Sequence, residues 1–287
     1  MSSSTYDHAI VSAACRRSSE DRASVAPIEG GLLLAVADGA GGSGGGARAA
    51  ALAVAALEQI AGGGRLDPPD LCAALRAIDA SIAADSEAGE TTALVGVVRG
   101  GLVHGAAVGN SGIRGIRGDR VVDPIDPPPQ RRPLLGSGGA VPAPFDGMSA
   151  AGTILVATDG LLDYLPSERL ASPKFGASAR AIAEALIAAV RLPSGGLHDD
   201  VTVIVCRLDR PDGRGRTSKD VEAAVVESHE DRRRSRRRGA ASGSVLQPAS
   251  IDRTAPTLTL RGASATILAA RPGQMHERHP VGGGAPP

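Results

Sequence analysis

The apolar residues of the chain are concentrated in its first 208 positions. Short apolar runs recur as far as residue 208, whereas residues 209–287 are rich in Ser, Gly, Pro and Arg. A segment of low hydrophobicity cannot bury enough apolar surface to offset the entropy lost on folding. The pattern therefore predicts one folded domain over residues 1–208 and a disordered tail over residues 209–287.

Four short apolar runs have the length of buried strands. They lie at residues 8–14, 32–37, 153–160 and 201–208. The run LLLAVA at 32–37 has no polar face, which is typical of a strand covered on both sides. Between these runs, residues 91–123 alternate β-branched segments with Arg-Gly-Gly and Arg-Gly-Asp turns, and this alternation predicts an antiparallel meander.

Helix-forming residues predict two helices in succession at 47–60 and 69–84, and a third at 177–190. The prolines of residues 123–147 are incompatible with a helix interior or a strand ladder, so a surface loop is expected there. Strands alternating with helix pairs indicate an α+β sandwich, in which sheets pack together and helices cover their outer faces.

Composition excludes several classes of partner. The formal net charge is zero, and the chain has only two Tyr, two Phe and no Trp, so neither a basic field nor base stacking favours nucleic acid. The arginines at 232–238 are a short block within the predicted tail, and no specific nucleic-acid partner is expected for them. Three scattered cysteines form no disulfide framework or metal spacing. With no membrane-length apolar run and no signal peptide, we expect a cytoplasmic protein without a membrane partner.

The stretch VADGAGGSGGG at 36–46 allows two local interpretations. Such glycine density after a strand is found in phosphate-binding loops, where backbone N–H groups approach an anion at a helix N-terminus. That interpretation lacks the usual lysine, and the nearest cation is Arg48. The alternative is a tight turn that ends a strand.

Carboxylates stand at the ends of several predicted strands. Asp38 follows one run, Asp159 follows the residues TILVAT of another, and Asp199 with Asp200 immediately precedes a third, while Asp21 lies after the first. A single such aspartate is commonly a turn former. Several of them on one rim of a sandwich would repel one another unless a hard divalent cation lay between them, and Mg²⁺ and Mn²⁺ prefer carboxylate oxygens. The positions therefore predict a metal site.

Six segments, in this order, resemble the metal-dependent serine/threonine protein phosphatases of the phosphatase 2C (PPM) type. They are RRSSEDR (16–22), VADGAGGSGGG (36–46), TTALVGVV (91–98), AAVGNSGIRGIRGDRV (106–121), LVATDGLLDYL (155–165) and HDDVTVIV (198–205). The resemblance covers residues 5–208. It implies a four-layer αββα sandwich of two antiparallel sheets flanked by helix pairs, with a binuclear metal site at one edge.

The same resemblance implies an activity and its partners. The activity is hydrolysis of phosphoserine and phosphothreonine in proteins, by a water that bridges two Mg²⁺ or Mn²⁺ ions and attacks phosphorus. The implied partners are phosphoprotein substrates, a serine/threonine kinase or that kinase's targets. A monomeric, bacterial-type signalling enzyme is expected.

The resemblance also assigns roles to residues of this chain. The implied metal ligands are Asp21, Asp38, Gly39, Asp159 and Asp199, with Glu20 and Asn110 as further candidates. Asp38 would bridge the two ions, and Gly39 would offer its backbone carbonyl. Arg16 would grip the substrate phosphate, for which a guanidinium fork is well suited.

This chain departs from the family pattern at several positions. Asn110 stands where an aspartate usually helps to hold a third ion, so a third site is expected to be weak or empty. Asp200 stands where an asparagine is usual, which adds charge and is not expected to harm metal binding. The mobile flap is expected to be reduced, or replaced by residues 123–147. A pseudophosphatase that binds phosphoproteins without turnover is the alternative, and a nucleotide hydrolase or cyclase on another fold is disfavoured.

Overall fold

The fold is given by a computed structural model that describes residues 5–41, 44–63, 65–125, 132–150, 152–172 and 178–209. The arginine block and residues 210–287 of the predicted tail lie outside the described residues. Everything below concerns the described part of the chain.

Ten strands form two five-stranded sheets in which every neighbouring pair is antiparallel. The first sheet has the order β1 (Thr5–Ala13), β10 (Val201–Asp209), β9 (Thr153–Ala157), β6 (Gly112–Arg117) and β7 (Arg120–Ile125). The second has the order β2 (Arg22–Ile28), β3 (Gly31–Ala37), β4 (Ala93–Arg99), β5 (Leu102–Val108) and β8 (Ala143–Ser149).

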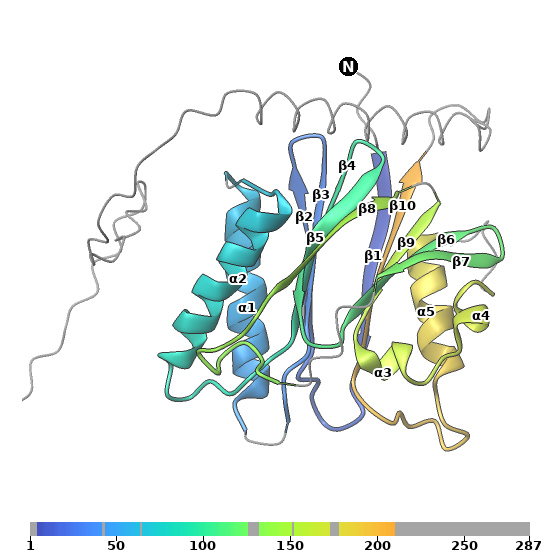
Figure 1. Ribbon diagram of the computed structural model, residues 1–287. Helices are drawn as coiled ribbons and strands as arrows, with labels where there is room; N and C mark the ends of the chain where they lie inside the picture. The colour runs from blue at the N-terminus through green and yellow to red at the C-terminus, as the bar shows by residue number, and fades with distance from the viewer. Residues whose placement is uncertain are drawn as a thin grey trace, which may run out of the picture. The chain divides into compact units, whose positions relative to one another are not determined.

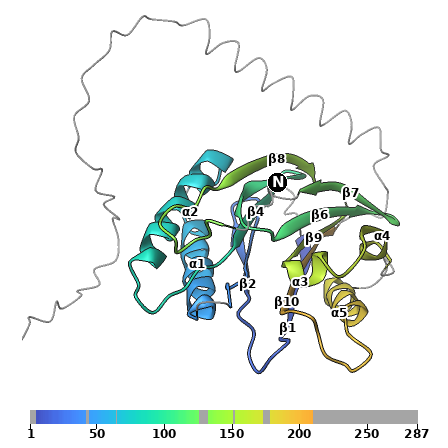
Figure 2. The ribbon, with the colours of Figure 1, turned by 60° about the horizontal axis from the view of Figure 1, so that its bottom comes forward.

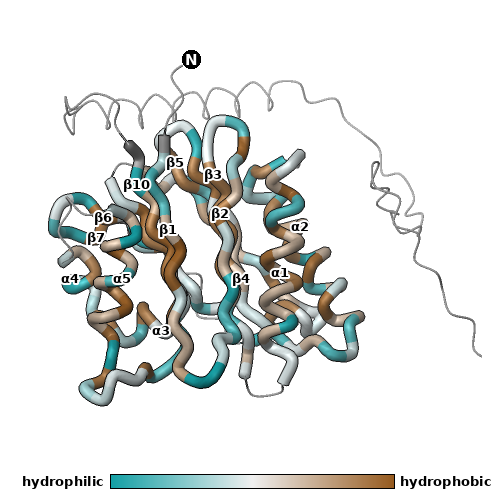
Figure 3. Tube along the Cα trace, turned by 180° about the vertical axis from the view of Figure 1, so that it is seen from behind, coloured by the Kyte–Doolittle hydropathy of each residue, from teal (hydrophilic) through white to brown (hydrophobic). Residues whose placement is uncertain are grey.

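Helices cover the outer face of each sheet, which confirms the four-layer αββα sandwich (Figure 1). The helices α1 (Gly46–Ala61) and α2 (Pro68–Ala83) lie on the second sheet. The helix α5 (Ala179–Ala189) lies on the first, together with the short helices α3 (Asp159–Leu162) and α4 (Ser167–Leu170). A long apolar stretch marks β1 in Figure 3, whereas the hairpin of β6 and β7 carries several hydrophilic residues.

The strand β3 shows how an aliphatic sequence supports this layering. Leu33, Ala35 and Ala37 point into the layer between the second sheet and its helices. Leu32, Leu34 and Val36 point into the layer between the two sheets. Side chains alternate between the two faces of a strand, so a strand with apolar layers on both faces has no position for a polar residue.

The prediction of one continuous antiparallel meander over residues 91–123 is wrong in one respect. The hairpins β4–β5 and β6–β7 both form, but they belong to different sheets. The chain crosses from one sheet to the other at residues 109–111, where Gly109 adopts a φ of 95°. An alternating pattern predicts each hairpin, because the hairpin is local, but it does not specify the sheet that the hairpin joins.

The prediction of a surface loop over residues 123–147 is also wrong in part. Residues 143–147 belong to β8, which pairs with β5 although it contains Pro144. Proline is tolerated because β8 is an edge strand, in which one row of N–H groups needs no partner within the sheet. The edge strand β2 was not predicted at all, because it is only partly buried and contains Pro27.

The segment that leads into β8 is fixed by a buried carboxylate of α2. Asp79 is only 4% exposed and accepts hydrogen bonds from the backbone N–H groups of Gly136 (2.8 Å), Gly138 (3.0 Å) and Ala140 (2.9 Å). Both of its carboxylate oxygens are therefore in use. Hydrogen bonds to a charged acceptor are stronger than neutral ones, so Asp79 orders this segment.

Replacing Asp79 with alanine is expected to lower the free energy of unfolding by about 2–3 kcal/mol, because backbone N–H groups lose their acceptor inside the protein. Urea denaturation followed by circular dichroism measures the change. The control is Asp119→Ala, at a side chain that is 96% exposed. An Asp79→Ala protein as stable as the control protein would contradict the role of Asp79.

Candidate active site

The strand ends that carry the acidic residues predicted to bind metal lie at one edge of the sandwich, the lower edge in Figure 1, which Figure 2 brings forward. Asp38 follows β3 of the second sheet, and Asp21 precedes β2 of the same sheet. Asp159 begins α3 directly after β9 of the first sheet, and Asp199 precedes β10. Strands of both sheets thus deliver a carboxylate to the same edge.

The backbone of Asp38 is held by two threonines at the start of β4. The N–H of Asp38 donates to the hydroxyl oxygen of Thr92 (3.0 Å), and the carbonyl of Asp38 accepts from the hydroxyl of Thr91 (2.9 Å) and from the N–H of Thr92 (2.8 Å). Both threonines are buried. Both threonines lie in a segment that resembles the phosphatase family, but the sequence indicated no role for them. The structure shows that they fix the position of Asp38.

Asp21 is held in a similar way by a residue of the other sheet. Its side chain is buried, and its Oδ2 accepts a hydrogen bond from the hydroxyl of Thr158 (2.9 Å), which lies between β9 and Asp159. Thr158 in turn accepts from the N–H of Thr202 in β10 (3.0 Å). Thr158 therefore ties the start of β2 to the end of β9, a role that its sequence context did not indicate.

The carboxyl groups of this edge interact with one another strongly. Burial, followed by the charges of Asp21 and Asp159, raises the pKa of Asp38 to about 9. Burial raises the pKa of Asp21 to about 6. Each ionised carboxylate disfavours ionisation of its neighbours, so this edge retains a proton near neutral pH when no metal is bound.

Two oxygens of this edge are buried without a hydrogen-bond partner among the described residues, Oδ1 of Asp21 and Oδ1 of Asp159. A buried carboxylate oxygen without a partner is costly, and a cation removes that cost. Across residues 5–209, as far as they are described, no three His, Cys, Asp or Glu side chains converge closely enough to hold an ion as they stand. The donor set fits a hard divalent ion, which would draw these carboxylates together.

Asn110 lies beside Asp159. Its Nδ2 donates a hydrogen bond to Oδ2 of Asp159 at 2.7 Å. An aspartate at position 110 would offer no donor when ionised and would repel Asp159.

The remaining predicted residues lie around this edge. Asp199 is exposed, and its charge is among those that raise the pKa of Asp38. Arg16 is exposed on the loop between β1 and β2, where its guanidinium can be reached by a ligand. The carboxylate of Glu20 lies next to Gly41, so that a β-carbon at position 41 would come within 2.7 Å of Oε2 of Glu20.

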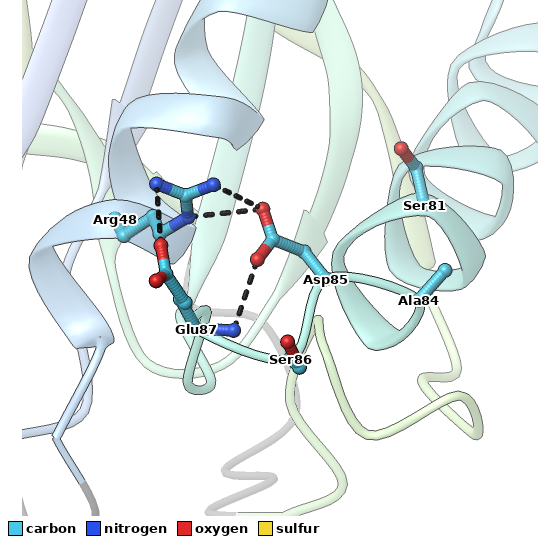
Figure 4. A pocket seen from close by; sticks show the side chains of 6 residues that line it. All are labelled: Arg48, Ser81, Ala84, Asp85, Ser86 and Glu87. Carbon is cyan, nitrogen blue, oxygen red and sulfur yellow. Dashed lines mark hydrogen bonds and ion pairs between the residues drawn. The ribbon is translucent and has the colours of Figure 1, made fainter. Parts of the chain in front are cut away.

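The glycines after Asp38 serve close backbone packing. A β-carbon on Gly39 would overlap the backbone of Gly46 at the start of α1, so position 39 accepts no side chain. Arg48, the cation nearest to this turn, is occupied elsewhere: it pairs with Asp85 (2.8 Å) and Glu87 (3.3 Å) (Figure 4). The phosphate-loop interpretation thus loses its only nearby cation.

These ion pairs lie in an open cavity of about 490 Å³ (Figure 4). It is lined by Arg48, Ser81, Ala84, Asp85, Ser86 and Glu87. The acidic residues that were predicted to bind metal do not line it.

Several solved structures are similar to this chain. The Mycobacterium tuberculosis serine/threonine phosphatase PstP/Ppp is 26% identical, with a TM-score of 0.60 over 71% of this chain and 99% of that chain. The catalytic domain of PstP in complex with 2 manganese ions is 25% identical, with a TM-score of 0.59 over the same shares. A bacterial serine phosphatase is 17% identical, with a TM-score of 0.62 over 72% of this chain and 100% of that chain.

No protein-family model and no curated protein matches the sequence. The family is therefore indicated by three findings together: the four-layer fold, the acidic edge at which β3 and β9 end, and the likeness to solved bacterial phosphatases. The chain therefore shares its fold with bacterial serine/threonine phosphatases, and this likeness supports its resemblance to the metal-dependent phosphatases of the 2C type.

Proposed function

We propose that this protein removes phosphate from phosphoserine and phosphothreonine in proteins, using two Mn²⁺ or Mg²⁺ ions at the acidic edge. The observation that carries the proposal is the set of carboxyl groups of buried Asp21 and half-buried Asp38 and Asp159, which come from both sheets and leave two oxygens without partners. The PstP catalytic domain, a relative at 25% identity, is in complex with 2 manganese ions, which supports the choice of metal.

The proposed ligands are Asp21, Asp38, Gly39, Asp159 and Asp199. Bound divalent ions would activate a water and the phosphate ester as Lewis acids. Asp38, held by Thr91 and Thr92, would be the central ligand because its carboxyl group interacts with three of the other acidic residues. Glu20 lies over the glycine turn and stays a further candidate.

Arg16 is proposed to bind the phosphate group of the substrate. It is exposed, and it belongs to the same loop as Asp21, which places a cation beside the acidic edge. A guanidinium can donate two parallel hydrogen bonds to phosphate oxygens, which orients the ester for attack.

Phosphoproteins, including targets of a serine/threonine kinase, are the proposed partners of a monomeric enzyme. We place it in the cytoplasm, a proposal supported by its three cysteines, none of which forms a disulfide. In the part of the chain that the structure describes, no helix is both long and apolar enough to cross a membrane.

Release of inorganic phosphate from a phosphothreonine peptide tests the proposed function. We expect release with Mn²⁺, loss of activity in excess chelator, and recovery when Mn²⁺ is added back. A rate that is indifferent to chelator would overturn the proposal of metal-dependent catalysis.

A pseudophosphatase is the second candidate, and the contact between Asn110 and Asp159 is the observation that favours it. The amide contributes no charge to this edge. Calorimetric binding of Mn²⁺ without measurable phosphate release would support the pseudophosphatase. Mn²⁺ binding accompanied by turnover would exclude it.

Replacing Asn110 with aspartate is expected to destabilise the metal-free protein by about 1–2 kcal/mol, because a donor is replaced by a charge that faces Asp159. Thermal unfolding in chelator measures this effect, and saturating Mn²⁺ should reduce it. An Asn110→Asp protein that is as stable in chelator as the unmodified protein would show that the hydrogen bond to Asp159 is unimportant.

A further inference from the structure

Asp200 is a buried acidic residue between Asp199 and β10 that the proposed mechanism does not use. It is 9% exposed, and each of its carboxylate oxygens accepts one backbone hydrogen bond. Oδ1 accepts from the N–H of Cys15 at 2.8 Å, and Oδ2 accepts from the N–H of Glu20 at 2.7 Å. Both distances are short, as expected for hydrogen bonds to a charged acceptor.

The two donors lie at opposite ends of the loop between β1 and β2, the loop that carries Arg16. Residues 16–18 of this loop are exposed. At its far end, the N–H of Asp21 donates to the hydroxyl of Ser19 at 3.1 Å, which is a local contact. Asp200 therefore clamps the base of an exposed loop to the start of β10.

The backbone of Asp200 connects two further segments of the site. Its N–H donates to Oδ1 of Asp199 at 2.8 Å. Its carbonyl oxygen lies against Gly160, where a β-carbon would overlap it, so the residue after Asp159 packs directly on Asp200. One residue thus joins the Arg16 loop to the segments that carry Asp159 and Asp199.

We propose that Asp200 is a positioning residue that holds the loop of residues 15–20 so that Arg16 can bind the phosphate group of the substrate. The inference rests on the proposed phosphatase function. A loop that is ordered before binding loses less conformational entropy when the ligand arrives, so the clamp increases affinity for phosphate. An asparagine at position 200 has one acceptor oxygen, and its NH₂ group would face an N–H donor. Only the aspartate can hold both ends of the loop.

A double-mutant cycle tests this role by steady-state kinetics on the phosphothreonine peptide with saturating Mn²⁺. We expect Asp200→Asn to raise KM about tenfold, the effect of losing one hydrogen bond to a charged group, and to change kcat less than about threefold. Inhibition by inorganic phosphate should weaken by a similar factor. Because Asp200 acts through Arg16, Asp200→Asn should add nothing to Arg16→Ala.

Additive effects of the two substitutions, or an unchanged KM and phosphate inhibition in Asp200→Asn, would overturn the proposal. Asp200→Asn is preferred to Asp200→Ala because it preserves the volume of a buried side chain.

A second readout does not depend on activity. Hydrogen exchange of the amides of Cys15 and Glu20 should be faster in Asp200→Asn, while Mn²⁺ affinity is unchanged. Unchanged exchange would contradict the clamp even in a protein without turnover. Faster exchange in an inactive protein would instead show that the clamp exists and the phosphatase proposal is wrong.

Discussion

An Asp38→Asn protein is expected to release phosphate from a phosphothreonine peptide at least about 10³-fold more slowly than the unmodified protein. Asp38 lies at the centre of the acidic edge, where the charges of Asp21, Asp159 and Asp199 all act on its carboxyl group. An amide has one metal-binding oxygen and no charge, so it cannot bridge two ions as a carboxylate does. The measurement is kcat/KM at saturating Mn²⁺.

The matched control for this substitution is Asp119→Asn, which makes the same chemical change at an exposed turn between β6 and β7. We expect this control to keep full activity. Circular dichroism should show a native fold for both proteins, because the half-buried Asp38 carboxyl, close to other acidic groups, is itself unfavourable without metal. An Asp38→Asn protein with more than about a tenth of the original activity would contradict the central position of Asp38.

The second large effect concerns stability in the absence of metal. Burial and neighbouring carboxylates raise the pKa of Asp38 from the ordinary 3.8 to about 9 in the folded protein. Between these two values the folded state holds a proton that the unfolded state has lost. The free energy of unfolding must then fall as pH rises, by up to about 1.4 kcal/mol for each pH unit. Asp21, whose pKa is raised to about 6, adds to the decline near its own range.

Urea denaturation in chelator between pH 5 and pH 9 measures this decline. The Asp38→Asn protein lacks the titrating group, so its stability relative to the unmodified protein should increase steadily as pH rises. Saturating Mn²⁺ should reverse the order of the two proteins, because the ion takes the place of the proton that the metal-free carboxyl retains. A stability difference that does not vary with pH would contradict the coupling of these carboxyl groups.

The positions of the acidic residues could be predicted because they depend on local pattern. The apolar run before Asp38 forms β3, and the run before Asp159 forms β9, so a carboxylate directly after each strand reaches an edge of its sheet. The resemblance to phosphatases of the 2C type then supplied roles for these residues. The helices α1 and α2 were predicted for the same reason, since helix propensity is a property of neighbouring residues.

The residue roles that the sequence did not reveal depend on contacts between segments that are distant along the chain. Thr158 is important because it donates to Asp21, and Asp200 because it accepts from Cys15 and Glu20. No local pattern distinguishes such a threonine or aspartate from a turn residue. The need for glycine at position 160 likewise arises only when α3 packs against the carbonyl of Asp200.

The edge strands were difficult to predict for a related physical reason. A central strand such as β3 needs apolar side chains on both faces, which leaves a clear apolar run. The edge strands β2 and β8 are only partly buried and contain proline, so their sequences resemble loops. Their place in the second sheet follows from pairing with β3 and β5, which is a tertiary property.

The most direct test of the account is a crystal structure of the protein soaked with Mn²⁺, with anomalous diffraction recorded at the manganese edge. We expect two manganese peaks at the edge where β3 and β9 end, with the carboxylate of Asp38 contacting both ions. We also expect Asp159 to approach one of them. Peaks located only elsewhere, or an Asp38 carboxylate that contacts no ion at saturating Mn²⁺, would contradict the proposed metal centre.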